Sequence, residues 1–372
     1  MSELTNMTDD IYFAPLLPWQ HGLWSQLTMR VLAQKQSLPH ALLAAGMQGM
    51  GKRAFVWRLV AWLLCRARDE HPLGACGHCE SCQWLRSGTH PSLQALPLIS
   101  LPISADNAHT QEVASGTAKD KKTTKAASNG SLKIKVDEIR ALQPFIYQGG
   151  QGMRICVLDH AEQMTIAAAN ALLKTLEEPQ AQVHLFLISD APAQLLPTIK
   201  SRVQQLSLQT IDPAIAVDYV TKVLGSTVHR EALGTDVIEQ LIQLANGAPL
   251  AAVALAQAPW YSKRALWLTT WQALRSGKRS SVAASDYWQI HLGIAEFIRL
   301  SELMVIDIRR VGLGFEAQQK DINFSTTLNG YQPIDNELEA FAHSLQQTKI
   351  ALQQNVQEKF AYDKLMQELA CL

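Results

Sequence analysis

Short apolar runs alternate with helical patterns in the first half of the chain. Residues 40–45, 154–158 and 183–188 are apolar nearly throughout, which is typical of strands buried on both faces of a parallel sheet. Between the last two runs, residues 166–178 are rich in Ala and Leu, and Pro179 follows, which predicts a helix and its stop. Strands that alternate with helices predict a parallel α/β sheet.

Helical periodicity dominates after about residue 208. Asp212-Pro213 predicts a helix cap with Pro at the first helical position, and Asn246-Gly247 predicts a helix stop. Apolar residues keep helical spacing up to the end of the chain. We therefore expect an α/β core over residues 1–208, a small helical domain over 209–258 and a larger helical domain over 259–372.

One segment of the α/β core, residues 104–131, breaks this rhythm. Thr, Ser, Ala, Gly, Asp and Lys dominate it, and it has no aromatic residue. Such a segment cannot bury enough apolar surface to offset the entropy lost on ordering. We predict a disordered insertion in a surface loop, to which the sequence assigns no function.

Composition places the chain among globular proteins of two or three domains. It has 372 residues, of which 47% are hydrophobic and 18% charged. Lys plus Arg equals Asp plus Glu, 33 each, so the formal net charge is zero. Because phosphate contacts supply most non-specific affinity for DNA, we expect any DNA contact to be local or shared with partners.

The location of the protein is expected to be cytoplasmic. Residues 1–10 carry acids and no apolar core, which does not match a signal peptide. The most apolar run, residues 54–65, is interrupted by Arg58 and is shorter than the roughly 20 residues that cross a bilayer. No membrane association is therefore expected.

Residues 46–53, Gly-Met-Gln-Gly-Met-Gly-Lys-Arg, match the phosphate-binding pattern G-x-x-G-x-G-K. In such a loop the glycines let backbone N–H groups surround phosphates, the lysine reaches the β- and γ-phosphates, and a following Ser or Thr binds Mg²⁺. Arg53 replaces that hydroxyl residue and puts a positive charge where Mg²⁺ would sit. The alternative is a tight glycine turn without a ligand. The candidate nucleotide residues here are Gly46, Gly49, Gly51 and Lys52.

A second phosphate-site element follows the run at residues 154–158. Asp159 stands where an acid would help to hold Mg²⁺, but the next position, where a second acid would polarise the attacking water, is His160. We expect Glu162 to point elsewhere. Intrinsic ATP hydrolysis is therefore not expected, while ATP binding and Mg²⁺ binding stay open.

Four cysteines follow the pattern C-x10-C-x2-C-x2-C. Four thiolates complete a tetrahedron around Zn²⁺ without an open position, so such a site is structural rather than catalytic. Free buried cysteines and a redox C-x-x-C pair are the alternatives. Cys156 and Cys371 fall within apolar patterns, so we expect both to be plain core residues. The predicted zinc ligands are Cys65, Cys76, Cys79 and Cys82.

Taken together, these motifs resemble bacterial clamp-loader subunits of the AAA+ class. The resemblance is carried by the His-Ala-Leu-Leu of residues 40–43, the altered P-loop, the cysteine module, Gly-Thr-His-Pro at 88–91, Ile-Lys-Val-Asp-Glu-Ile-Arg at 134–140 and Asn-Ala-Leu-Leu-Lys-Thr-Leu-Glu-Glu-Pro at 170–179. It is strong over residues 15–208 and weak beyond. It implies an AAA+ P-loop core with a zinc-binding insertion at 65–90, a helical lid at 209–258 and a helical collar at 259–372.

The resemblance also assigns a role to Arg202. Ser201-Arg202-Val203 stands where the family has Ser-Arg-Cys, whose arginine acts in trans on the γ-phosphate bound by the neighbouring subunit. Guanidinium suits this role because it is permanently charged and binds phosphate oxygens in pairs. Leu250 replaces a sensor arginine of the active relatives. The alternative for Arg202 is an ordinary surface arginine near a strand start.

The chain lacks residues needed for ATP hydrolysis but retains the four cysteines. In this combination it resembles DNA polymerase III subunits of the delta prime type. The resemblance implies a non-hydrolysing accessory subunit of a DNA-directed DNA polymerase (nucleotidyltransferase) holoenzyme. Its partners would be delta and gamma/tau, with the sliding clamp and primed DNA reached through the complex.

Two other functions remain open. One is a catalytically active AAA+ motor of the gamma/tau type that tolerates Arg53. The other is a zinc-finger DNA-binding module, although residues 75–86 offer only Arg86 and His78 for contacts to phosphates.

Overall fold

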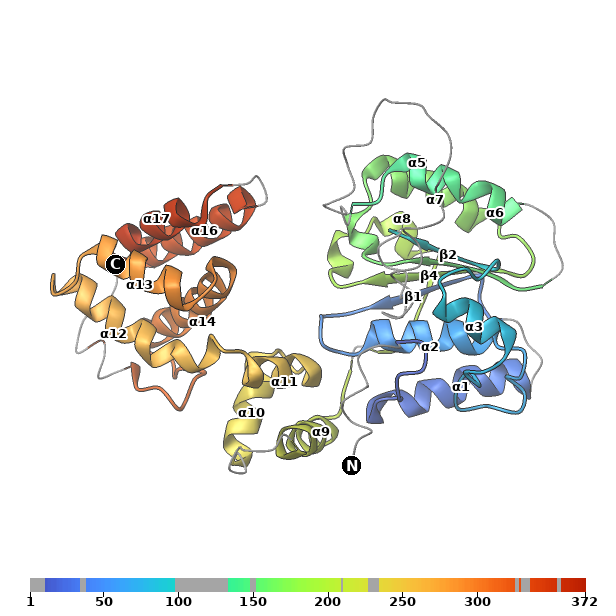
Figure 1. The fold of residues 1–372 in the computed structure, drawn as a ribbon, viewed down its shortest axis with the longest axis horizontal. Helices are drawn as coiled ribbons and strands as arrows, with labels where there is room; N and C mark the ends of the chain where they lie inside the picture. Colours follow the sequence, from blue (N-terminus) through green and yellow to red (C-terminus); the bar gives the residue numbers. More distant parts are fainter. Residues whose placement is uncertain are drawn as a thin grey trace. The chain divides into compact units, whose positions relative to one another are not determined.

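The structure, a computed structural model, describes residues 11–33, 38–97, 133–147, 152–208, 210–226, 234–324, 328, 335–352 and 356–372. The insertion predicted at residues 104–131 lies outside these described residues. The chain forms two compact units, Met1–Ile215 and Ala216–Leu372 (Figure 1). The further division of the second unit at residue 258 stays a prediction.

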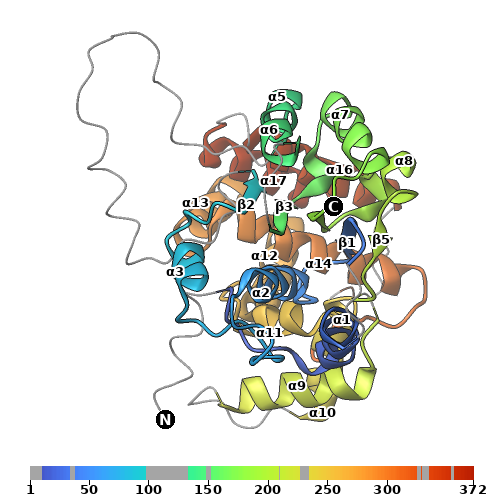
Figure 2. The same cartoon turned by 90° about the vertical axis from the view of Figure 1, so that its right-hand side faces the viewer.

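The first unit is built on a five-stranded sheet in which neighbouring strands run parallel, in the order β2-β3-β4-β1-β5. The predicted parallel α/β sheet is therefore confirmed. In Figure 2 the labelled strands β2, β3, β1 and β5 follow one another from left to right. The strands are β1 (Ala41–Ala45), β2 (Leu93–Leu96), β3 (Arg154–Leu158), β4 (Val183–Ser189) and β5 (Gln204–Gln205).

Helices cover both faces of this sheet, with α1 and α2 on one side and α5 and α7 on the other (Figures 1 and 2). Successive strand residues point to opposite faces. Leu42 therefore joins the apolar cluster of Trp57 and Phe186, whereas Leu43 joins the opposite cluster with Leu172. Both faces are buried at the central strands β1, β3 and β4, which explains why these strands are apolar nearly throughout. The helices of this unit are α1 (His21–Leu32), α2 (Lys52–Leu64), α3 (Glu80–Arg86), α5 (Val136–Ala141), α6 (Gln143–Tyr147), α7 (Ile166–Glu177) and α8 (Pro197–Lys200).

The second unit is helical throughout its described part, as predicted. Helix α9 crosses the boundary between the units, since it begins at Pro213, and the carboxylate of Asp212 accepts a hydrogen bond from the Ala214 N–H at 2.8 Å. The predicted helix stop lies between α10 and α11, in a turn where Asn246 and Gly247 have φ of 53° and 81°. The helices are α9 (Pro213–Ser226), α10 (Thr235–Leu244), α11 (Pro249–Gln257), α12 (Arg264–Arg275), α13 (Ser281–His291), α14 (Ile294–Gly312), α16 (Asp335–Leu352) and α17 (Glu358–Cys371).

Two apolar clusters stabilise this unit. A small one joins α9, α10 and α11 through Val220, Leu241 and Ala252. A larger one is built from α12 to α17 and includes Trp267 and Trp288, both fully buried. Full burial of a Leu or Phe side chain contributes roughly 1.5–3 kcal/mol, so both clusters stabilise the unit.

Among the described helices, none alone combines the length and apolar character that a membrane span needs. The pair α10 and α11 meets these criteria only when its members are joined, and it is bent by 108° at the break.

Candidate functional site

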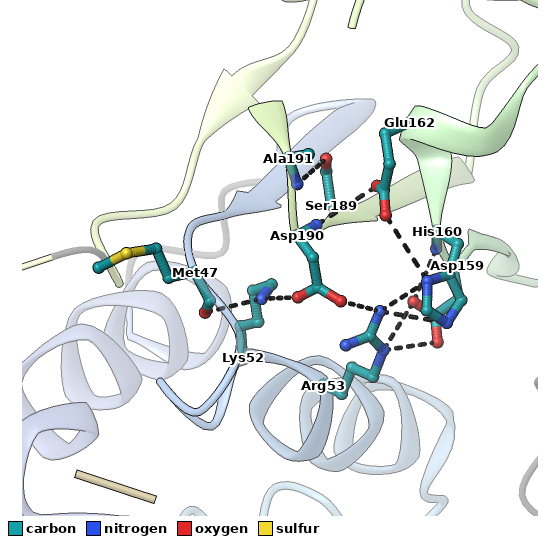
Figure 3. Close-up of polar contacts among 9 residues, drawn as sticks. All are labelled: Met47, Lys52, Arg53, Asp159, His160, Glu162, Ser189, Asp190 and Ala191. Carbon is teal, nitrogen blue, oxygen red and sulfur yellow. Dashed lines mark hydrogen bonds and ion pairs between the residues drawn. The ribbon is translucent and has the colours of Figure 1, made fainter. Parts of the chain in front are cut away.

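The candidate nucleotide site lies where three parallel strands end side by side. Strand β4 is hydrogen-bonded to β1 on one side and to β3 on the other. The P-loop follows β1, Asp159 follows β3, and Asp190 follows β4. Ligands of open α/β sheets bind at such carboxyl ends. Figure 3 shows the side chains that gather there.

The P-loop keeps the backbone conformation that its glycines allow. Gly46, Gly49 and Gly51 have φ of 150°, 90° and 79°, in the region that side chains disfavour. Gly51 directly precedes α2, and its carbonyl accepts a hydrogen bond from the Gln20 side chain at 3.0 Å. Trp19 donates to the carbonyl of Met50, also at 3.0 Å. The loop is thus held from outside by the segment that precedes α1.

Lys52, the lysine of the P-loop, is already bonded within the protein. Its side chain is 2% exposed, donates to the Met47 carbonyl at 3.0 Å and forms an ion pair with Asp190. Burial alone would raise the pKa of the Asp190 carboxyl. Hydrogen bonds and charges from Arg53 and Lys52 outweigh it and lower that pKa below its ordinary value.

Arg53 lies between Asp159 and Asp190, two of the three carboxylates of the site (Figure 3). Its Nε donates to both oxygens of Asp159, at 2.9 and 3.0 Å, and its Nη2 lies 2.7 Å from Asp190 Oδ2. Burial favours a lower pKa of the guanidinium, but the bonds and charges of Asp190 and Asp159 raise it overall. The side chain therefore stays charged, in a place where a divalent cation would need these carboxylate oxygens as ligands.

The prediction that Glu162 points away from the site is wrong. Its side chain is 5% exposed. One carboxylate oxygen accepts a hydrogen bond from the Asp190 backbone N–H at 3.3 Å, and the other lies 3.6 Å from Nδ1 of His160. The reason is a sharp reversal after β3, since His160 has φ of 52° and a short 3-10 turn, Ala161–Gln163, follows. The chain folds back over the end of β4 instead of leaving the sheet edge.

Asp190 was not predicted from the sequence, although it pairs with both Lys52 and Arg53. A signal was present, because Asp190 is the first charged residue after a strand that is buried at all of its positions.

The four predicted zinc ligands come together in the first unit. The sulfurs of Cys65, Cys76, Cys79 and Cys82 all lie within 4.8 Å of one another. Three of the separations are 4.0 Å (Cys65–Cys79), 3.9 Å (Cys76–Cys82) and 3.5 Å (Cys79–Cys82). Four sulfurs at about 2.3 Å from a tetrahedral ion would lie roughly 3.8 Å apart. The cluster therefore has the size of a metal site.

Local structure explains the cluster. Cys65 ends α2, Cys79 caps α3 and Cys82 lies within α3, while Gly77 takes a left-handed φ of 80° in the turn between them. Burial would raise the pKa of the Cys79 thiol, but N–H groups of Cys82 and Arg66 bond its sulfur and hold the pKa at about 6. Burial raises the pKa of the Cys82 thiol. A bound dication would relieve the repulsion among such thiolates.

Arg202 lies beyond α8 and contacts α7. Its Nη1 donates to the Thr198 carbonyl at 3.0 Å and to Ser201 Oγ at 3.3 Å, and its Nη2 lies 2.9 Å from a carboxylate oxygen of Glu177. Ser201 Oγ itself donates to the same carbonyl at 3.0 Å. Leu250 belongs to α11 of the second unit.

Comparison with known proteins identifies the family to which the chain belongs. A Pseudomonas aeruginosa protein named DNA polymerase III subunit delta' is 36% identical over 241 residues, which cover 64% of this chain and 61% of that protein. A Yersinia pestis protein of the same name is 30% identical over 273 residues, covering 72% and 67% of the two chains. The family model described as "DNA polymerase III, delta subunit" matches residues 20–212, more than half of the chain. The chain belongs to the DNA polymerase III delta prime family.

A third delta prime relative, from Escherichia coli, is 29% identical over 249 residues, with 66% of this chain and 63% of the relative covered. The matched region thus spans about three fifths of the Pseudomonas delta prime protein. The segment that the family model matches contains the P-loop, the cysteine cluster and Arg202.

Proposed function

We propose that this delta prime family member is a non-hydrolysing AAA+ subunit of a DNA polymerase III clamp loader. It would act in the cytoplasm with delta and gamma/tau subunits, in a complex that loads the sliding clamp onto primed DNA. The observation that carries this proposal is the position of Arg53, which bonds Asp159 and Asp190 at the end of the P-loop.

A bound Mg²⁺–triphosphate would have to disrupt this arrangement. Mg²⁺ needs oxygen ligands in near-octahedral geometry, but Arg53 already bonds the oxygens of Asp159. Lys52 would have to leave Asp190 to reach a phosphate. That carboxylate would then face the phosphates with one counter-charge fewer, which Coulomb repulsion disfavours. His160 offers no carboxylate base for the attacking water. The site is therefore suited to stay inactive.

Arg202 supports the second half of the proposal, a contribution in trans to the ATP site of a neighbouring subunit. Its side chain is 36% exposed, so a group on another subunit can reach it. A guanidinium placed against the γ-phosphate of a neighbour offsets the charge that develops during hydrolysis. Ser201 would help to hold the guanidinium, because its Oγ accepts a hydrogen bond from Nη1 of Arg202 at 3.3 Å.

We further propose that the cysteine cluster binds one structural Zn²⁺, since four sulfurs leave no open coordination position. Residues 209–258 would form the lid of the AAA+ module, and residues 259–372 would pack into the collar of the complex.

The direct test of the inactive site is ATP turnover by the isolated chain. We expect no turnover above background, and the double variant Arg53→Thr, His160→Glu should add little, because Lys52 stays paired with Asp190. Turnover by the wild-type chain that Lys52→Ala abolishes would favour the other candidate, an active motor of the gamma/tau type.

A further inference from the structure

The guanidinium of Arg202 is held by two different helices. Its Nη1 bonds the backbone carbonyl of Thr198 in α8 at 3.0 Å, and its Nη2 lies 2.9 Å from the carboxylate of Glu177, the last residue of α7. The short helix α8 is anchored by Ile199, which is fully buried between the sheet and its covering helices. The carboxylate thus fixes the outer end of a side chain whose backbone is already fixed.

The position of Glu177 is not explained by the stability of α7. The C-terminal end of a helix carries partial negative charge, so a cation is preferred there and a carboxylate is disfavoured. Two successive carboxylates, Glu177 and Glu178, end this helix. The ion pair with Arg202 offsets the charge of the first.

We propose that Glu177 is the positioning residue for Arg202, holding its guanidinium in the orientation that meets the triphosphate of the neighbouring subunit. This inference rests on the proposed function of Arg202 in trans. Without the carboxylate, the guanidinium would lose one of its three contacts, and the long side chain would sample more rotamers. The rate of ATP hydrolysis by the neighbouring subunit would then fall because the positive charge of Arg202 is misplaced, not because it is missing.

The geometry leaves donors for a phosphate. A guanidinium has five N–H donors, and the contacts with Thr198, Ser201 and Glu177 use three of them. Both members of the ion pair are also accessible, since the Arg202 side chain is 36% exposed and that of Glu177 is 51% exposed. An exposed pair is weak enough to let the guanidinium shift by a small distance when a phosphate approaches.

The experiment compares variants of this chain in the reconstituted clamp-loader complex with its ATPase partners. Glu177→Ala is expected to lower kcat for ATP about twofold or more, because the charge is misplaced. KM for ATP should stay unchanged, because the neighbour's own P-loop binds the nucleotide. Glu177→Gln, which retains an acceptor for Nη2, should restore part of the rate. Glu178→Ala is the matched control, an exposed carboxylate one residue further on, and should leave the rate unchanged.

A double variant separates this inference from the function on which it rests. Glu177→Ala combined with Arg202→Ala should show the same rate as Arg202→Ala alone, because Glu177 acts through the arginine. If Arg202→Ala lowers the rate and Glu177→Ala leaves it unchanged or raises it, the positioning role is wrong and the trans role stands. If Arg202→Ala itself has no effect, the trans role fails and the positioning role fails with it.

Discussion

At position 53, one arginine in place of a hydroxyl residue changes what the P-loop can hold. A Ser or Thr hydroxyl would be one ligand of Mg²⁺, whereas the Arg53 guanidinium bonds Asp159 and Asp190 directly. The guanidinium of Arg53 thus supplies the positive charge that Mg²⁺ would otherwise bring to these carboxylates. We infer that this residue stabilises the empty site and disfavours the loaded one.

Arg53→Ala should therefore destabilise the first unit by about 1–2 kcal/mol. The variant leaves Asp159, which is 5% exposed, and Asp190 without this counter-charge. The loss is small because solvent screens the Arg53 side chain, which is 25% exposed. Urea unfolding at neutral pH measures the change. Arg140→Ala, which removes an exposed arginine of the same unit, should cost less than about 0.5 kcal/mol. Equal losses for the two variants would contradict a special role of Arg53.

Residues of the site differ in how well the sequence predicts them. Lys52, Arg53 and Asp159 follow from motif position, since each has a fixed place relative to a strand. Asp190 follows a buried strand, but its pairing with the P-loop depends on the strand order, which no local pattern gives. The placement of Glu162 depends on the left-handed turn at His160, which the sequence pattern did not predict.

At the scale of elements, the cysteine module joins α2 to β2. The Ser81 hydroxyl donates to the Leu64 carbonyl at 2.7 Å, and its oxygen lies 2.8 Å from Nε2 of buried His90. Nδ1 of His90 accepts the Ser92 N–H at 3.1 Å, so Nε2 carries the proton and donates to Ser81. Burial lowers the pKa of His90 to about 4, which keeps this chain of bonds neutral at physiological pH.

Cys82→Ser should abolish most of the metal content of the purified chain and loosen this module. Metal analysis should give about one zinc per wild-type chain, because four sulfurs form one closed site. Cys156 is buried as expected, but the prediction that Cys371 is a core residue is wrong, because this last residue of α17 is exposed. Cys371→Ser is therefore the control, since Cys371 also lies outside the cluster. Wild-type chain without zinc but with an intact fold would exclude a structural metal there.

The elements themselves were predicted unevenly. Strands β1, β3 and β4 follow from apolar runs because they lie in the middle of the sheet and are covered on both faces. The two outer strands were not predicted. β2 is apolar at three of its four residues but is too short for its pattern to indicate a strand, and the two residues of β5 are glutamines with exposed side chains.

At the scale of the whole molecule, the two units have separate cores, and a polar network ties the second unit together. Arg264, 7% exposed, bonds both carboxylate oxygens of Asp321 at 3.0 and 2.6 Å. The Gln240 side chain, from α10, donates to the same carboxylate at 2.8 Å. Burial would raise the pKa of Asp321, but the bonds from Arg264 and Gln240 lower it. This network connects the segments that the sequence assigns to lid and collar.

We expect thermal unfolding of the full chain in two transitions, of which Arg264→Ala lowers one. Loss of the cation leaves the Asp321 carboxylate without its bidentate partner, at a cost of about 2 kcal/mol, since that carboxylate is 40% exposed. For a unit of this size the transition should fall by roughly 4–8 °C in calorimetry. Lys222→Ala, which removes an exposed i,i+4 pair in the same unit, should leave both transitions in place. A shift of both transitions by Arg264→Ala would contradict independent cores.

The most direct test of the account is the steady-state ATPase rate of the reconstituted complex, measured with Lys52→Ala and with Arg202→Ala in this chain. We predict that Lys52→Ala, which alters only this chain's own P-loop, leaves the rate unchanged, and that Arg202→Ala lowers it at least about threefold. The opposite pattern, a rate that depends on Lys52 and not on Arg202, would show that this subunit hydrolyses ATP itself and lends no arginine to its neighbour.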